Sequence, residues 1–320
     1  MLKVVVIGYG EMFTNLIAAA LDANCEIVGV LRKEIIKYPA WIRTLKDIIC
    51  PSTEHNYIKS YNLKELKGIK SVNDEKFRKM LIKLNPDIIL VGSWGERFSK
   101  ETYNIPKIAT INAHPSLLPK YRGPNPYFWV IKNQETESGV TLHLMDEGYD
   151  TGAILAQEIV KIYPSDTGET LKKRTVLTAR GVACELLKDL SEDVIIPLTQ
   201  REDKASYYSY PSDLELDFRK KSAEENYAVI RAIYPWSRAW FYHDITPLTP
   251  NHKHISIEEN NTKYEIAGTI TEADSETCSI SVLCADNKIL KMSNLELYKK
   301  YDKPFTKYYI LREVHTGDII

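Results

Sequence analysis

The N-terminal stretch LKVVVIGYGEMFTNLIAAALDAN, residues 2–24, decides the fold class. It opens with a run of β-branched residues typical of a buried strand, passes through a Gly-x-Gly turn, and continues with apolar residues at helical spacing. Similar patterns return in CEIVGVL (25–31), FRKMLIKLNPDIILVGSWG (77–95) and KIATINAH (107–114). This alternation of strands and helices predicts an α/β fold with a doubly wound, mostly parallel sheet.

The turn Gly8-Tyr9-Gly10 raises the question of a bound dinucleotide, because glycines there let a phosphate approach a helix N-terminus. The dinucleotide fingerprint is incomplete, since Phe13 stands where its third glycine belongs and no acidic residue ends the second strand. We therefore interpret the turn as structural. An NADP-linked enzyme that uses Arg32 is the competing interpretation, and we expect neither that role nor a non-enzymatic one.

The pattern changes at about residue 200, where a polar, tyrosine-rich stretch begins. Short strand-like pieces follow in KYEIAGTITE (263–272), CSISVLCAD (278–286) and KILKMSNLEL (288–297). We predict a catalytic domain over residues 1–200 and a small β-rich, OB-like domain over residues 201–320, which serves substrate specificity or dimerisation.

Composition narrows the classes of function. The chain has 42 Lys and Arg against 43 Asp and Glu, and this balance gives no global attraction to nucleic acid or to an anionic membrane. Its five cysteines include no Cys-x-x-Cys pair, so neither a disulfide framework nor a thiolate metal site is expected. No apolar run reaches the roughly 18 residues that a membrane helix needs. These features predict a cytoplasmic protein without a membrane or metal partner.

Polar residues at the end of the fourth expected strand form the candidate catalytic site. Asn112 and His114 are two residues apart on a segment that Pro115 keeps extended, so their side chains leave the same face. An Asn amide can donate to an oxygen that becomes negative, and a His can move a proton or carry compensating charge. Asp150, in the loop after the next strand, could orient His114 and raise its basicity. A capping Asn, a surface His and a turn Asp are the structural alternatives.

The segments INAHPSLLPKYRG (111–123) and GVTLHLMDEGYDTGAIL (139–155) together resemble the 10-formyltetrahydrofolate-using formyltransferases. This family includes glycinamide ribonucleotide transformylase, methionyl-tRNA formyltransferase and the sugar-nucleotide N-formyltransferases. The resemblance implies a formyltransferase-type Rossmann-like fold in which Asn112, His114 and Asp150 are the catalytic triad. It implies that Asn112 and His114 hold the oxyanion of a tetrahedral intermediate and that Asp150 assists proton removal, without a metal or a covalent enzyme intermediate.

The resemblance covers residues 1–200 well and residues 201–320 loosely, and in relatives the peptide before the proline matching Pro119 is often cis. It also implies that the formyl donor, 10-formyltetrahydrofolate, lies between the loop after the third strand and the loop that carries Asp150. Trp94 and Arg97 depart from the apolar residues expected there. The residues predicted to contact the donor are Trp94, Gly95, Glu96, Arg97, Phe98, Asp146, Glu147, Gly148 and Tyr149.

The continuation YRGPNPYFWVIKNQETESGVTLH (121–143) resembles the amino-sugar enzymes most, which implies a nucleotide-linked amino sugar as the acceptor. Aromatic rings stack on sugars and bases, and an arginine pairs with phosphate. Packing of Trp129 on a buried helix face is the structural alternative. The residues predicted to bind the acceptor are Ser116, Tyr121, Arg122, Gly123, Pro126 and Trp129.

Methionyl-tRNA is the alternative acceptor. A domain that holds tRNA should be basic, yet residues 201–320 contain 16 Lys and Arg against 19 Asp and Glu, a formal net charge of −3. The segment 32–52 lacks the glycine-containing basic loop of the tRNA enzymes, although five of its residues could contact phosphates: Arg32, Lys33, Lys37, Arg43 and Lys46. A second open alternative is that the site uses an acyl donor other than 10-formyltetrahydrofolate. Sugar enzymes of this family commonly pair through the C-terminal domain, so a homodimer is expected by analogy.

Overall fold

The computed structural model describes residues 1–33, 51–191, 196–298 and 303–320. Lys37, Arg43 and Lys46, which were predicted to contact phosphates, lie outside these ranges. The chain divides into two compact units. The first consists of residues 1–126, 137–161 and 172–209, and the second of residues 127–136, 162–171 and 210–320. The domain boundaries expected at 1–200 and 201–320 stay a prediction.

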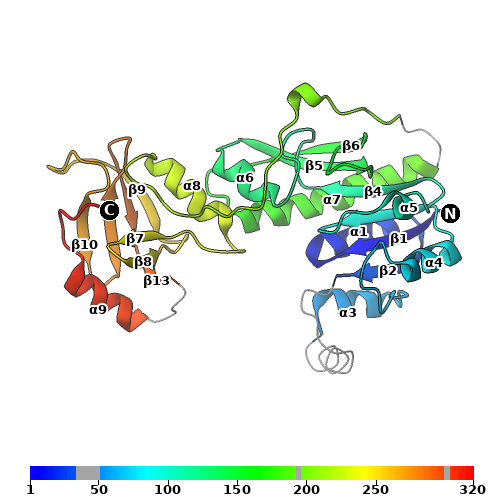
Figure 1. Ribbon diagram of the computed structural model, residues 1–320, viewed down its shortest axis with the longest axis horizontal. Coiled ribbons are helices and arrows are strands. Elements are labelled where there is room, and N and C mark those ends of the chain that lie inside the picture. Colours follow the sequence, from blue (N-terminus) through cyan, green and yellow to red (C-terminus); the bar gives the residue numbers. More distant parts are fainter. Residues whose placement is uncertain (34–50, 192–195, 299–302) are drawn as a thin grey trace. The chain divides into compact units, whose positions relative to one another are not determined.

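The first unit contains a six-stranded sheet with the order β2-β1-β3-β4-β5-β6 (Figure 1). Its strands are β1 (Lys3–Gly8), β2 (Glu26–Arg32), β3 (Ile88–Gly92), β4 (Ala109–His114), β5 (Glu137–Leu144) and β6 (Ile154–Lys161). The first four strands run parallel, whereas β5 is antiparallel to both β4 and β6. The predicted α/β fold with a mostly parallel sheet is confirmed.

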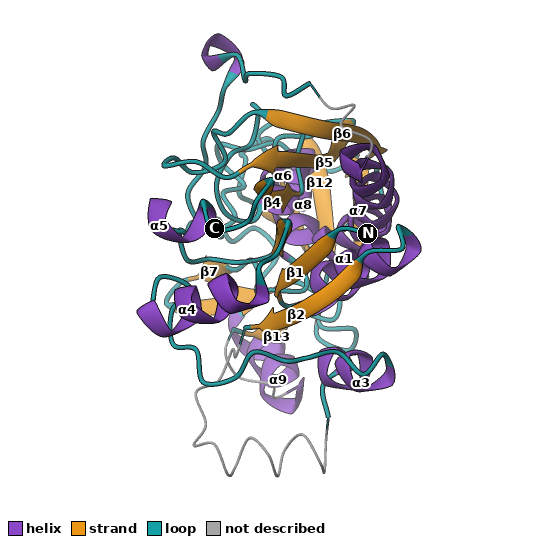
Figure 2. Cartoon of the chain, turned by 90° about the vertical axis from the view of Figure 1, so that its right-hand side faces the viewer, coloured by secondary structure: helices purple, strands orange, loops and turns teal. Residues whose placement is uncertain are grey.

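Helices cover both faces of this sheet. They are α1 (Gly10–Asp22), α3 (Thr53–Ser60), α4 (Glu75–Leu84), α5 (Lys100–Tyr103) and the part of α7 (Gly168–Ser191) from Lys172 onward, since its first four residues belong to the second unit. Figure 2 shows α1 and α7 on one face and α4 and α5 on the other. Alternate residues of β1 therefore enter two different cores: Val4 and Val6 pack with α1, while Val5 and Ile7 pack with α4. Burial on both faces explains why this strand is apolar from Val4 onward.

The glycine turn after β1 serves the packing of the sheet. A Cβ atom on Gly8 would lie 2.3 Å from the carbonyl oxygen of Gly92 on β3, so no larger residue fits. Gly10 has a φ of 64°, in the region that favours glycine. Its backbone N–H donates to a carboxylate oxygen of Glu54 at 2.9 Å. The chain's own carboxylate thus lies where a dinucleotide phosphate would bind, which supports the structural interpretation of the turn.

The second unit is rich in β-structure, as predicted. Its sheets have the orders β10-β11-β12-β9 and β13-β8-β7. The elements are α6 (Pro126–Lys132, whose first residue belongs to the first unit), α8 (Ala223–Ile233), β7 (Phe241–His243), β8 (Thr246–Thr249), β9 (Ile255–Glu259), β10 (Ile270–Asp274), β11 (Ser279–Leu283), β12 (Lys288–Met292), β13 (Glu296–Leu297) and α9 (Lys303–Glu313). The strand expected over 263–272 begins only at Ile270, after the turn around Gly268, whose φ is 89°.

Candidate active site

Strand pairing builds the candidate site at the carboxyl end of β4. Asn112 and His114 alternate on this strand, and the antiparallel register places Asn112 opposite His143 of β5. Asp150 follows in the loop between β5 and β6, with a φ of 58°. The sheet therefore brings together the three residues that the sequence singled out, and it adds a second histidine to them.

The carboxylate of Asp150 lies at the centre of this group. Its Oδ1 atom is 3.4 Å from Asn112 Nδ2 and 3.5 Å from His143 Nε2. Its Oδ2 atom is 3.5 Å from His114 Nδ1 and accepts a hydrogen bond from the backbone N–H of Gly123 at 2.9 Å. One carboxylate thus links β4, β5 and the loop after β4.

The tautomer of His114 follows from its backbone contact. Its Nε2 atom lies 2.8 Å from the carbonyl oxygen of Tyr121, which can only accept, so Nε2 carries a proton. In the neutral ring, the lone pair of Nδ1 then faces Asp150. The side chain is buried, with 4% exposure, and this burial lowers the pKa of His114 despite the nearby carboxylate. At neutral pH the His114 ring is therefore uncharged, and it would form an ion pair with Asp150 on gaining a proton.

His143 is the site residue that the sequence interpretation missed. Its Nδ1 atom lies 2.8 Å from the carbonyl oxygen of Leu144, so Nδ1 carries the proton of the neutral ring and Nε2 accepts from Asn112 Nδ2 at 3.1 Å. The available signal was a histidine between two leucines, Leu142 and Leu144, in a buried strand. Its position opposite Asn112 depends on an antiparallel register that a sequence does not display.

Asp150 is ionised in this setting. Burial by itself would raise the pKa of this carboxyl, but attraction to the protonated rings of His114 and His143, together with the N–H of Gly123, outweighs burial and holds its pKa well below its usual range. The site therefore keeps a fixed negative charge beside the unprotonated nitrogen of His114.

The residues predicted to contact the donor come from two loops that touch each other. Arg97 Nη1 donates to the carbonyl oxygen of Glu147 at 3.1 Å, and its guanidinium lies 5.9 Å from the ring centre of Tyr149. Asp146 Oδ1 accepts from the N–H of Gly148 at 2.9 Å, which closes the second loop on itself. Arg97 thus joins the loop after β3 to the loop that leads to Asp150.

Within the loop after β3, the predicted residues have different environments. Phe98 is buried in the core beneath α4, and Glu96 accepts from Ser71 Oγ and from the N–H of Val72. The indole Nε1 of Trp94 is buried without a hydrogen-bond partner among the described residues. Gly95 lies near the Lys33 ammonium, which a Cβ atom would approach to 3.4 Å. Trp94 is therefore the member of this loop with an unused buried donor.

The residues predicted to bind the acceptor are largely engaged by the protein itself. Ser116 Oγ donates to the carbonyl oxygen of Lys120 at 2.8 Å, and Tyr121 stacks on Tyr208 with ring centres 5.1 Å apart. The peptide between Leu118 and Pro119 is cis. These contacts shape the loop after β4.

Arg122, predicted to pair with phosphate, is buried and forms an ion pair with Glu202 at 2.7 Å. Pro126 begins α6, and the N–H of Gly123 binds Asp150 as described above. Trp129 belongs to the second unit, where its ring meets Phe128 edge to face and lies 4.9 Å below the ammonium of Lys132. Contact with an acceptor stays a prediction for these residues.

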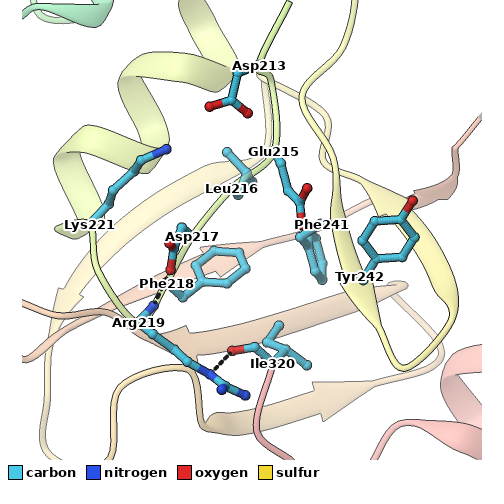
Figure 3. Close-up of a pocket in the computed structure, with 10 residues that line it drawn as sticks. All are labelled: Asp213, Glu215, Leu216, Asp217, Phe218, Arg219, Lys221, Phe241, Tyr242 and Ile320. Carbon is cyan, nitrogen blue, oxygen red and sulfur yellow. Dashed lines mark hydrogen bonds between the residues drawn. The ribbon is translucent and has the colours of Figure 1, made fainter.

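The second unit contains a pocket of about 450 Å³, whose lining residues are drawn in Figure 3. Phe218 and Phe241 line it beside the carboxylates of Asp213 and Glu215, and Arg219 Nε donates to the carbonyl oxygen of Ile320 at 3.0 Å. This pocket contains none of the residues predicted for the site. Within the ranges that the structure describes, no helix has both the length and the apolar character to cross a membrane.

A doubly wound sheet with polar side chains at the end of a central strand is typical of α/β enzymes, which bind their ligands at the carboxyl edge of the sheet. Residues 2–184 match the family described as "Formyl transferase", and residues 209–306 match "Formyl transferase, C-terminal domain". The chain belongs to the formyl transferase family, and it is an enzyme of that class.

Two relatives and one solved structure illustrate this membership. The "Methionyl-tRNA formyltransferase" of Halothermothrix orenii is 31% identical over 262 residues, which cover 78% of this chain and 79% of that protein. The protein of the same description from Clostridioides difficile is 28% identical over the full length of both chains. A Helicobacter canadensis N-formyltransferase, crystallised with folinic acid and dTDP-3-aminofucose, superposes with a TM-score of 0.65 at 20% identity, covering 92% of this chain and 100% of that one. This last likeness supports the fold.

Proposed function

We propose that the protein transfers the formyl group of 10-formyltetrahydrofolate to the primary amine of a nucleotide-linked amino sugar. The observation that carries the proposal is the buried group in which Asp150 meets both Asn112 and His114. Membership of the formyl transferase family supports the reaction class. The crystal structure from H. canadensis, with its folate and amino-sugar nucleotide, supports this donor and acceptor for the same fold.

In the proposed reaction, the neutral amine attacks the formyl carbon and forms a tetrahedral intermediate. Asn112 Nδ2 donates to the oxyanion with the hydrogen that now makes the long, 3.4 Å contact to Asp150, while its other hydrogen stays on His143. The proton lost by the attacking nitrogen passes to His114 Nδ1, where Asp150 stabilises the resulting imidazolium. The positive ring then compensates the oxyanion.

Collapse of the intermediate breaks the bond between the formyl carbon and N10 of the folate. The proton held at His114 is delivered to N10, so the products are the N-formyl sugar and tetrahydrofolate. We place the donor between the two loops that Arg97 joins, with the unused indole N–H of Trp94 available to it. We further propose a cytoplasmic enzyme, in keeping with an odd number of cysteines and no Cys-x-x-Cys pair. A homodimer stays a prediction.

Methionyl-tRNA is the second candidate acceptor. The relatives from H. orenii and C. difficile both carry the description methionyl-tRNA formyltransferase, and the second matches over the full chain. Against this candidate stands the formal net charge of −3 on residues 201–320, because tRNA binding depends on neutralising phosphates with Lys and Arg.

The test is a formyl-transfer assay with 10-formyltetrahydrofolate and either a panel of nucleotide-linked amino sugars or methionyl-tRNA, at one fixed salt concentration. We expect turnover of at least one amino sugar, and loss of that turnover in a His114→Ala variant that still binds folate. Turnover of methionyl-tRNA alone would replace the sugar by the second candidate. Unchanged turnover in the His114→Ala variant would overturn the assigned site.

A further inference from the structure

The segment 200–208 of the first unit runs alongside the loop after β4. The N–H of Arg122 donates to the carbonyl oxygen of Ser206 at 2.8 Å, and the N–H of Tyr208 donates back to the carbonyl oxygen of Arg122 at 3.0 Å. The N–H of Tyr121 donates to Ser206 Oγ at 2.9 Å. Residues distant in sequence from the candidate site are therefore bonded directly to the loop whose carbonyl at Tyr121 holds His114.

Gln200, at the start of this segment, reaches the other side of the site. Its side-chain Nε2 donates to the carbonyl oxygens of Asp150 at 2.8 Å and of Gly152 at 2.7 Å. Its Oε1 accepts from Arg122 Nη2 at 2.8 Å and from Arg122 Nε at 3.2 Å. The side chain is only 6% exposed, and both of its hydrogens and its oxygen are used.

The backbone that Gln200 holds has an unusual conformation. Asp150 has a φ of 58°, a region that residues other than glycine occupy at a cost in free energy. This conformation turns the carboxylate toward His114 and the N–H of Gly123. At Gly152 a Cβ atom would lie 1.8 Å from the carbonyl oxygen of Leu144, so this end of the loop is fixed by close packing. The side-chain amide of Gln200 bonds to both ends of the segment from Asp150 to Gly152.

Arg122 holds the side chain of Gln200 through its oxygen. Its guanidinium binds Gln200 Oε1 and, through Nη1 and Nη2, the carboxylate of Glu202 at 3.0 and 2.7 Å. A planar guanidinium bound in this way fixes the amide plane of Gln200, and with it the direction of both N–H donors.

We propose that Gln200, oriented by Arg122, is a positioning residue that holds the backbone of Asp150 so that its carboxylate faces His114. The proposal rests on the function proposed above, for which Asp150 and His114 move the proton. It assigns Arg122 a role in supporting the carboxylate of Asp150, while its contact with an acceptor phosphate stays a prediction.

The test compares three variants with the unaltered protein. Gln200→Glu keeps an oxygen for Arg122 but removes both donors to the carbonyls of Asp150 and Gly152. Gln200→Met removes the polar contacts without adding a charge, and it keeps the proposal testable if the Glu variant does not fold. Arg201→Ala is the matched control, since the side chain of the adjacent Arg201 is exposed and pairs with Asp203.

Two readouts separate positioning from a purely structural role. The first is kcat for formyl transfer, which we expect to fall roughly 10- to 100-fold in both Gln200 variants while KM for the donor stays within about twofold. The second is the pKa of His114, measured by NMR titration and assigned with a His114→Gln variant. Asp150 and His143 are the titratable groups that face this ring. Because Asp150 favours the charged ring, its misplacement should lower that pKa further, by roughly one unit.

A folded Gln200 variant with an unchanged His114 pKa would overturn the proposal, as would equal effects in Arg201→Ala. The NMR titration needs no substrate. If the unaltered protein transfers formyl to none of the acceptors, the proposed function fails, while the titration still decides whether Gln200 positions Asp150.

Discussion

Asn112 and His143 face each other across the β4–β5 pair, with Asn112 Nδ2 3.1 Å from His143 Nε2. The same nitrogen lies 3.4 Å from Asp150 Oδ1, which fixes the end of the Asn112 amide that is nitrogen, because a carboxylate can only accept. The Nδ2 group of Asn112 therefore points toward Asp150, where the proposed oxyanion would accept a hydrogen bond from it. His143 acts on the site through Asn112.

Replacing His143 by Ala should therefore lower kcat with little change in KM. We expect a loss of roughly tenfold, or about 1.4 kcal/mol of transition-state stabilisation, because the Asn112 amide is then free to turn. Steady-state kinetics measure this directly. His254→Ala, on an exposed position of the second unit, is the control and should leave kcat unchanged.

Replacing Asn112 by Ala removes the proposed oxyanion donor itself. Loss of one such donor costs about 10²- to 10³-fold in kcat. The formyl donor should still bind, and titration of folate binding would show this. A loss of less than tenfold in a folded variant would argue that another group stabilises the oxyanion.

The buried state of His114 predicts how the free energy of unfolding depends on pH. The pKa of His114 is lowered in the folded protein, so below pH 6.5 the unfolded chain binds a proton that the folded chain does not. Stability from this residue is present above pH 6.5 and is lost as the pH falls, at most at roughly 1.4 kcal/mol per pH unit.

Urea denaturation of the unaltered protein and of His114→Gln between pH 5 and 8 measures this effect. The difference between the two proteins should change with pH below 6.5 and be constant above it. A constant difference over the whole range would contradict a lowered pKa.

Two glycines should respond to alanine in opposite ways. At Gly8 the new Cβ would lie 2.3 Å from the carbonyl oxygen of Gly92, so β1 and β3 must separate and stability should fall by about 1–3 kcal/mol. At Gly181, inside α7, a Cβ atom meets nothing within 4 Å, and Ala should stabilise the helix by up to about 1 kcal/mol. Thermal unfolding of both variants compares them, and a stable Gly8→Ala protein would show that the strands can give way.

The sequence predicted the parts of the site that depend on local rules. Alternation on an extended strand places Asn112 and His114 on one side, and the carboxyl edge of the sheet collects the loop that holds Asp150. His143 was missed because its role depends on the register between two antiparallel strands. The partners of Arg122 lie 78 and 80 residues further along the chain, so its burial could not be expected from its neighbours.

The carboxylate of Glu54 on the N–H of Gly10 has a consequence for the choice of ligand. In many doubly wound proteins this point of the sheet attracts the phosphates of a nucleotide. Here an anion that approaches it meets a negative charge and a donor that is already bound. Glu54 lies 44 residues further along the chain, so a contact between distant segments occupies the backbone donor that the Gly-x-Gly turn offers.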